Sequence, residues 1–85
     1  MKKIVCSIYD HKAKVFCVPF FSVNNETAQR DFGYAANDPK TEIGRYPTDF
    51  TLFRLGTYDD ETAGFDLEPH SNLGIAANFV GELNV

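Results

Sequence analysis

The sequence predicts a small α+β domain in which two β-hairpins flank one helix, in the order ββαββ, followed by a C-terminal arm. Two extended apolar runs open the chain, a segment with helical spacing follows them, and a strongly aromatic and β-branched segment comes next. The 85 residues make one domain, with an expected core at 1–68 and an arm at 69–85. We expect an antiparallel sheet with the helix on one face and a second copy of the chain on the other, as a homodimer.

The first hairpin is predicted from extended runs at 3–9 and 14–20, joined by a tight turn at 10–13. If the hairpin is symmetric about the middle of that turn, Cys6 lies opposite Cys17. A slip of one residue would exchange the two faces of the hairpin. The face that looks like core carries Ile4, Cys6, Ile8, Val15, Cys17 and Pro19, and the other face carries Val5, Ser7, Tyr9, Lys14, Phe16 and Val18.

The two cysteines allow either a disulfide or reduced thiols. Directly opposed cysteines on a hairpin are close enough to oxidise. However, polar residues interrupt any apolar core after the basic start of the chain, so no export signal is recognised and reduced, buried thiols are expected. The spacing of Cys6, Cys17, His11 and His70 does not match the close pairs typical of zinc sites, and no metal or cofactor is predicted.

The stretch Ser-Val-Asn-Asn at 22–25 offers caps for a helix that is predicted to run to about Asn37. Pro39 ends it, because proline disfavours helical geometry at the residue before it. The residues with helical spacing that would face the core are Ala28, Phe32, Ala35 and Ala36.

The segment 46–65 gives the strongest apolar signal in the chain, and we expect its central part, 50–58, to be a buried strand. Arg54 should lie near an edge or pair with an acid. A turn at 59–61 leads to a short strand at 65–68, which Pro69 stops. The arm after it is either ordered or a mobile tail. Strict alternation places Phe50, Leu52, Arg54, Gly56 and Tyr58 on one face and Thr51, Phe53, Leu55 and Thr57 on the other, with both faces covered.

Charge is distributed unevenly along the chain. Residues 1–14 hold four lysines against one aspartate, a local charge of +3, and the remainder holds four basic residues against eleven acids, a local charge of −7. No apolar run approaches the length of a membrane span. Together with the lack of a recognised export signal, this leads us to expect a soluble protein of the cytoplasm. A phosphate-binding glycine loop and a nucleophile motif are both absent, so we do not expect an enzyme.

Lysines and aromatic residues alternate in the first hairpin, a composition that suits single-stranded nucleic acid. The lysines would attract phosphates and the rings would stack on bases. A second basic and aromatic pair precedes Pro47, where an ordinary packed-loop anchor is the favoured interpretation and a nucleic-acid contact is the alternative. The candidate binding residues are therefore Lys3, Tyr9, Lys12, Lys14 and Phe16 in the hairpin, with Arg45 and Tyr46 in the loop.

Six short segments occur in a fixed order within residues 3–68: Ser7–Asp10, Pro19–Phe21, Ala28–Phe32, Asn37–Pro39, Tyr46–Gly56 and Tyr58–Thr62. In this order the chain resembles the small non-structural protein of gokushoviruses, the single-stranded DNA bacteriophages of the Microviridae. The segment at 46–62 is the most specific part. In that family a glycine directly follows the turn threonine, whereas Ala63 intervenes here.

The resemblance implies a protein made during infection and absent from the mature shell. It implies DNA binding when replication turns from duplex synthesis to single-strand synthesis coupled with packaging, in the host cytoplasm. Two hypotheses remain. The chain binds single-stranded DNA through the basic hairpin, or it is an adaptor for the phage replication protein, the procapsid or a host replication factor, with the acidic body and aromatic central strand as its contact surface.

Overall fold

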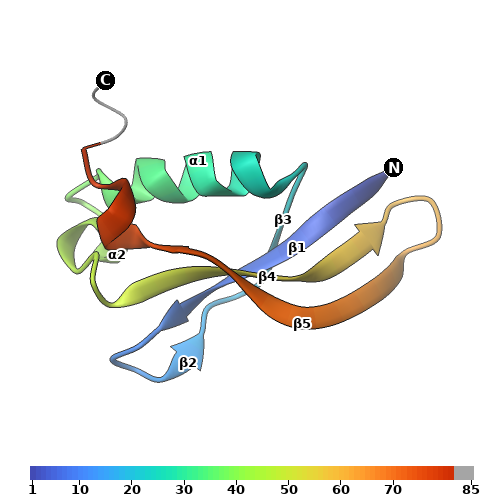
Figure 1. Cartoon of the computed structure of the whole chain (residues 1–85), viewed down its shortest axis with the longest axis horizontal. Coiled ribbons are helices and arrows are strands. Elements are labelled where there is room, and N and C mark those ends of the chain that lie inside the picture. Colours follow the sequence, from blue (N-terminus) through green and yellow to red (C-terminus); the bar gives the residue numbers. More distant parts are fainter. Residues whose placement is uncertain (82–85) are drawn as a thin grey trace.

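The computed structural model describes residues 1–81, which form a five-stranded antiparallel sheet with α1 lying across one face (Figure 1). The strand order is β2-β1-β4-β5, and β3 also pairs with β1. The predicted α+β class is confirmed. No helix within residues 1–81 is long and apolar enough to cross a membrane. The elements are β1 (Lys2–Asp10), β2 (Val15–Phe16), β3 (Phe20–Ser22), α1 (Asn25–Ala36), α2 (Glu42–Arg45), β4 (Phe50–Asp59), β5 (Gly64–Ile75) and the 3₁₀ helix η1 (Ala76–Phe79).

The first hairpin forms, but its register differs from the predicted one by two residues. Tyr9 lies opposite Phe16, whereas the prediction placed it opposite Lys14. The turn is longer than expected because the Asp10 carboxylate accepts hydrogen bonds from two backbone N–H groups of the turn, and its carbonyl accepts one from Lys14. Lys14 adopts a φ of 61° to close the turn. A shift of two residues keeps every β1 side chain on its predicted face.

The second predicted strand is broken into β2 and β3, since Pro19 has no N–H to donate to the sheet. As a result Cys6 lies opposite Phe20 and not opposite Cys17. The prediction that Val15, Cys17 and Pro19 join the core is wrong, because all three are exposed. Both thiols are free, but only Cys6 is buried, so the expectation of two buried thiols is also wrong for Cys17.

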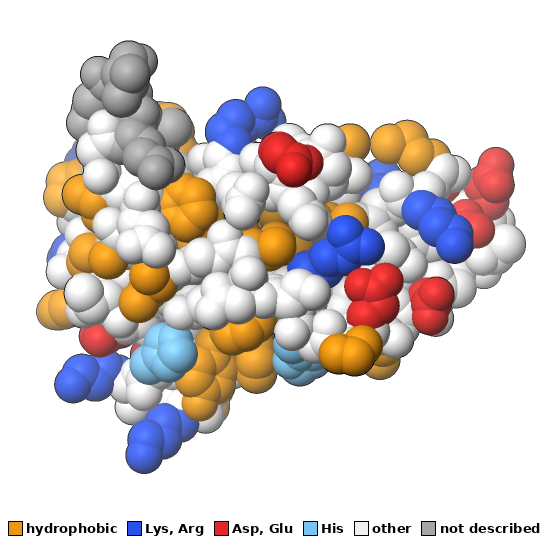
Figure 2. Space-filling view, viewed as in Figure 1, with side chains coloured by type: hydrophobic (Ala, Val, Ile, Leu, Met, Phe, Trp, Pro, Cys, Tyr) orange, Lys and Arg blue, Asp and Glu red, His pale blue; other side chains and the backbone are white. Residues whose placement is uncertain are grey.

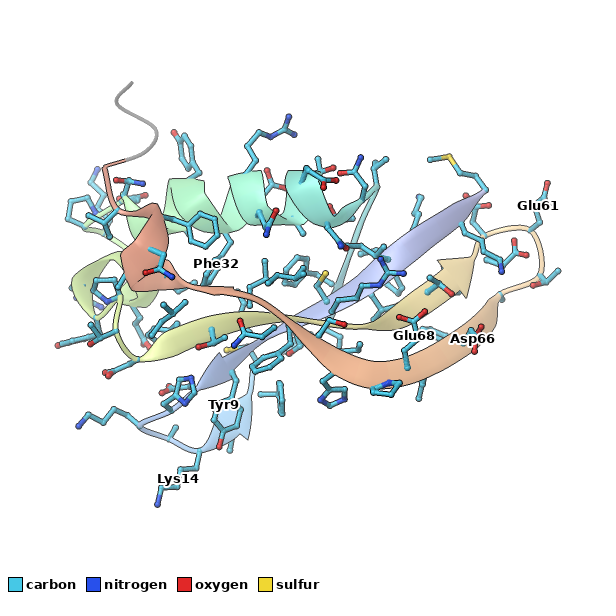
Figure 3. The ribbon with its side chains drawn as sticks, in the orientation of Figure 1. Tyr9, Lys14, Phe32, Glu61, Asp66 and Glu68 are labelled. Carbon is cyan, nitrogen blue, oxygen red and sulfur yellow. The ribbon has the colours of Figure 1, made fainter. Side chains whose placement is uncertain are left out.

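The predicted helix is confirmed as α1. The side chain of Asn24 caps its first turn by accepting a hydrogen bond from the backbone N–H of Thr27 at 2.8 Å. Phe32 is 3 % exposed and lies between the helix and the sheet (Figure 3). The core that α1 shares with the sheet consists of Ile4, Cys6, Ala28, Phe32, Ala36, Phe50, Leu52 and Ala76.

The predicted central strand is confirmed as β4, but its side chains do not alternate without interruption. Cys6 of β1 pairs with Arg54, and the preceding β1 residue pairs with Gly56, so Leu55 is an extra residue that forms a bulge. The prediction that Tyr58 shares a face with Leu52 is therefore wrong. Arg54 does pair with an acid, since its Nε lies 3.3 Å from a carboxylate oxygen of Glu68.

Strand β5 continues through Pro69, where the predicted strand stopped. Its pairing passes from Leu67 opposite Gly56 to Ser71 opposite Arg54, which leaves Pro69 in an irregular stretch at the edge of the sheet. The chain after β5 is ordered as η1, whose Phe79 ring lies 5.6 Å from the ring of Phe32. The last part of the predicted arm, residues 82–85, lies outside the described residues.

Gly56 allows β4 and β5 to approach at the bulge. A Cβ at this position would lie 2.2 Å from the carbonyl oxygen of Asp66, and the φ is +159°.

We expect Gly56→Ala to lower the free energy of unfolding by more than about 1 kcal/mol, measured by urea denaturation. Gly64→Ala is the matched control, since the closest atom to its Cβ would be a side-chain oxygen at 3.1 Å. Equal free energies of unfolding for the two variants would contradict the close approach of β4 and β5 at Gly56.

Candidate nucleic-acid interface

The face of the sheet opposite α1 carries no helix within the described residues, and we call it the open face (Figure 1). Tyr9 and Lys14 lie on this side, away from Phe32 (Figure 3). Strand register and ring contacts assign to it Lys3, Val5, Ser7, Tyr9, Phe16, Phe21, Thr51, Phe53, Tyr58, Phe65, Leu67 and His70. The smallest of these are buried beneath the rings, with Val5 at 4 %, Ser7 at 1 % and Thr51 at 3 % exposure.

One aromatic group lies at the end of the open face near the β1–β2 turn, and we call it the proximal cluster. The Phe16 ring is its centre, 4.8 Å from Tyr9, 5.8 Å from Phe53 and 5.6 Å from His70. His11 joins through an edge contact with Tyr9 at 4.9 Å and a 2.8 Å hydrogen bond with Thr51. Phe16 remains 44 % exposed. These rings form an accessible platform held by contacts from four segments of the chain.

A second aromatic group lies at the other end of the open face, and we call it the distal cluster. It consists of Phe21, Tyr58 and Phe65, which come from β3, β4 and β5. Tyr58 is the centre, 5.0 Å from Phe21 and 4.9 Å from Phe65. The bulge in β4 creates this cluster, because it turns Tyr58 away from the core. Phe21 is 49 % and Phe65 59 % exposed, so this platform is accessible as well.

Carboxylates are absent from the side chains that strand register places on the open face. Asp66 and Glu68 alternate with Phe65 and Leu67, so they point to the helix side, where Glu68 pairs with Arg54 (Figure 3). Lower in the space-filling view, hydrophobic and histidine side chains gather below the sheet and basic side chains project beside them (Figure 2). The two carboxylates of β5 are thus directed away from the aromatic rings of the open face.

The structure places the three predicted lysines at the two ends of this face. Lys14 lies in the turn beside the proximal cluster, and Lys12 lies in the same turn. Both are exposed, but Lys12 also lines the hollow that contains Asp10, Glu42 and Asp49. Lys3 pairs with Tyr58 at the distal end. The strand between Lys3 and Asp10 spans about 23 Å at 3.3 Å per residue. The basic residues of the hairpin therefore flank the aromatic surface and do not form one patch.

Arg45 and Tyr46 lie apart from the open face. Arg45 ends α2, and Tyr46 lines a surface hollow of about 340 Å³ together with Lys12. The other lining residues are Asp10, Glu42, Asp49 and Phe50. Three carboxylates against one lysine repel a phosphate, so the charge of this hollow gives no support for a nucleic-acid contact. Within residues 1–81, no group of three His, Cys, Asp or Glu side chains is arranged to hold a metal ion.

Sequence reasoning found Tyr9 and Phe16 but missed the other rings of the interface. The sequence places Phe53 and Tyr58 on opposite, covered faces of the central strand and gives them no role in binding nucleic acid. The alternation of Phe65 and Leu67 with acids was visible in the sequence as a signal of a strand with one apolar face. The missing information was the strand register, which brings residues from β2, β3, β4 and β5 beside β1.

Comparison with known proteins gives one family. The family model described as Phage ORF5 protein matches residues 3–79. Neither a curated protein nor a solved structure matches the chain. The matched range includes both aromatic clusters and the three lysines that flank them.

The thiol of Cys17 reports on the environment of the β1–β2 hairpin. Partial burial raises its pKa above the ordinary value, and the negative charges of Asp10 and Glu42 raise it further. A raised pKa leaves less thiolate at neutral pH, and the thiolate is the reactive form. Cys6 also has a raised pKa, mainly through burial, and is inaccessible.

We expect Cys17 to alkylate with iodoacetamide at pH 7.5 more slowly than glutathione, with a rate that still rises above pH 9. Cys6 should react only on unfolding. Asp10→Asn keeps an oxygen to cap the turn but removes the charge, so it should speed the reaction of Cys17. Asp31→Asn on α1 is the control and should change nothing. Equal rates at both thiols, measured by mass spectrometry, would show that the hairpin register is wrong.

Proposed function

The chain belongs to the Phage ORF5 protein family and is a phage protein, and we propose that it binds single-stranded DNA through the open face. The observation that carries the proposal is the combination of exposed aromatic rings with the absence of carboxylates among the strand residues that register places on that face. Lys14 adds positive charge beside the proximal cluster, and Lys12 adds charge in the same turn, where it also lines the hollow with Asp10, Glu42 and Asp49. Such a surface offers stacking and phosphate attraction together, the two terms that dominate binding of single strands.

Stacking explains why a single strand is favoured over a duplex. Each base stacked on an aromatic ring contributes about 1–3 kcal/mol, but a ring reaches the face of a base only when the base is not paired and stacked in a duplex. Of the proximal rings Tyr9, Phe16 and Phe53, the ring of Phe16 is the most accessible, at 44 % exposure, on a face that carries no helix within residues 1–81. Binding of this kind tolerates many sequences, since every base has an aromatic face.

The net charge of −4 does not oppose this proposal as strongly as it first suggests. Asp66 and Glu68 point to the helix side, and Asp10 is held in the turn by two backbone N–H groups. In the host cytoplasm, this binding would serve the change from duplex replication to single-strand synthesis and packaging.

A protein partner is the second candidate, because part of the exposed apolar surface is aliphatic. Leu67 is 72 % and Val18 85 % exposed. Aliphatic side chains do not stack on bases, and exposed apolar patches commonly mark protein contacts. On this alternative the open face would be covered by a second copy of the chain, or by a phage replication or capsid protein, as a non-enzymatic adaptor.

Binding of a fluorescein-labelled oligo(dT) strand, followed by anisotropy over a salt series, tests the proposal. We expect Phe16→Ala to weaken binding at least fivefold through lost stacking. Lys12→Glu with Lys14→Glu should weaken it further and make the salt dependence shallower, by about 0.7 in the log–log slope for each lost phosphate contact. The wild type should prefer the single strand to a duplex of the same sequence.

The matched controls lie on the helix side of the molecule. Tyr34→Ala removes an aromatic ring that is 72 % exposed on α1, and Lys40→Glu reverses an exposed charge after that helix. Both should bind as the wild type does. If these controls lose as much affinity as Phe16→Ala, or if the wild type binds no DNA at 150 mM salt, the proposal is wrong and a protein partner takes its place.

A further inference from the structure

We propose that the distal cluster is a second base-stacking subsite, so that one DNA strand runs along the β-strands from the β1–β2 turn to Lys3. This inference rests on the proposed function and extends it, by naming the path and the length of DNA that the open face holds. The first observation for it is geometric. The proximal and distal clusters lie on the same face of one sheet and share β1 and β4 as their floor.

The distal cluster has the same two components as the proximal one. Its rings are accessible, with Phe21 at 49 % and Phe65 at 59 % exposure. Its lysine is Lys3, whose cross-strand partner is Tyr58, and Tyr58 in turn pairs with Phe65. These three residues form one row across β1, β4 and β5. A base on the rings of this row would have its phosphate within reach of a lysine side chain.

Of the two acids next to this end, one points to the helix side and the other is already paired. Asp59 pairs with Lys2 and Gly64, on the helix side of the sheet. Asp60 lies in the turn beyond the row, where the N-terminal ammonium contacts it at 2.8 Å. That hydrogen bond, together with the charges of the ammonium and Lys3, lowers the pKa of Asp60, so it is ionised and already paired. The path therefore ends at the row of Lys3, before the β4–β5 turn.

The length of the face sets the size of the site. About 23 Å of strand separates Lys3 from Asp10. Stacked nucleotides repeat about every 3.4 Å along a strand, so the face holds about seven of them. This falls within the range of about 4–16 nucleotides that single-strand binding folds occupy. A strand shorter than the face would reach only one cluster.

Charge complementarity favours nucleic acid over a second copy as the occupant of the distal cluster. A second copy stacked on this face by a twofold axis would bring the same surface, without carboxylates and with lysines. Like charges would then meet around Lys3. A DNA strand instead brings phosphates to the lysines and bases to the rings.

The test compares oligo(dT) of 4 and 12 nucleotides by anisotropy, with native mass spectrometry on the same samples. We expect the 12-mer to bind more tightly than the 4-mer. Phe65→Ala and Lys3→Glu should weaken the 12-mer roughly tenfold and leave the 4-mer unchanged, because the short strand occupies the cluster beside two lysines. Phe16→Ala should weaken both. Lys2→Glu is the matched control for Lys3→Glu, since the two neighbouring lysines point to opposite faces.

The outcomes separate this inference from the proposed function. If the 4-mer binds and Phe16→Ala weakens it, but the 12-mer is no tighter and Phe65→Ala changes nothing, only the extended path is wrong. If Phe65→Ala converts a dimer to a monomer without changing DNA affinity, the distal cluster is a contact between copies, and the inference fails. If neither oligonucleotide binds the wild type, the inference fails together with the proposed function. Unchanged urea denaturation of each variant shows that folding is not the cause.

Discussion

The pairing of β1 with β4 decides which side chains reach the core and which reach solvent. From Asp10 opposite Phe50 to Cys6 opposite Arg54, alternate residues of the two strands face α1, and Cys6, Phe50 and Leu52 among them enter the core. The bulge at Leu55 then reverses the alternation of β4, so that Tyr58 joins the open face. Without this bulge the distal cluster would not exist, and the two ends of the sheet would expose different chemistry.

Much of the fold follows from local signals in the sequence. The helix, its asparagine cap and its buried stripe were predictable because periodicity and capping act within a few residues. The register of the first hairpin was not, because the carboxylate of Asp10 stabilises a longer turn than the residue types alone indicate. The continuation of β5 through Pro69 depends on a bulge opposite Leu55, which is a property of two strands together.

The candidate site was only partly predictable for the same reason. Tyr9, Phe16 and the neighbouring lysines are close in sequence, so composition was enough to find them. Phe21 and Phe65 become part of the surface only when β3 and β5 take their places beside β1 and β4. The separation of acids from the open face also depends on register. The net charge sums the charges of both faces, so it hides this separation. For that reason the excess of acids in the sequence favoured a protein partner.

The most direct test of the central claim, that the open face binds single-stranded DNA, is a residue-resolved NMR titration. Backbone amide and aromatic signals of uniformly labelled protein would be followed as a 12-nucleotide oligo(dT) strand is added. The account predicts shifts at Tyr9, Phe16, Phe53, Tyr58 and Phe65, with little change on the outer side of α1, represented by Tyr34. Shifts confined to α1 or to the hollow beside Tyr46, or no shifts at all, would contradict it.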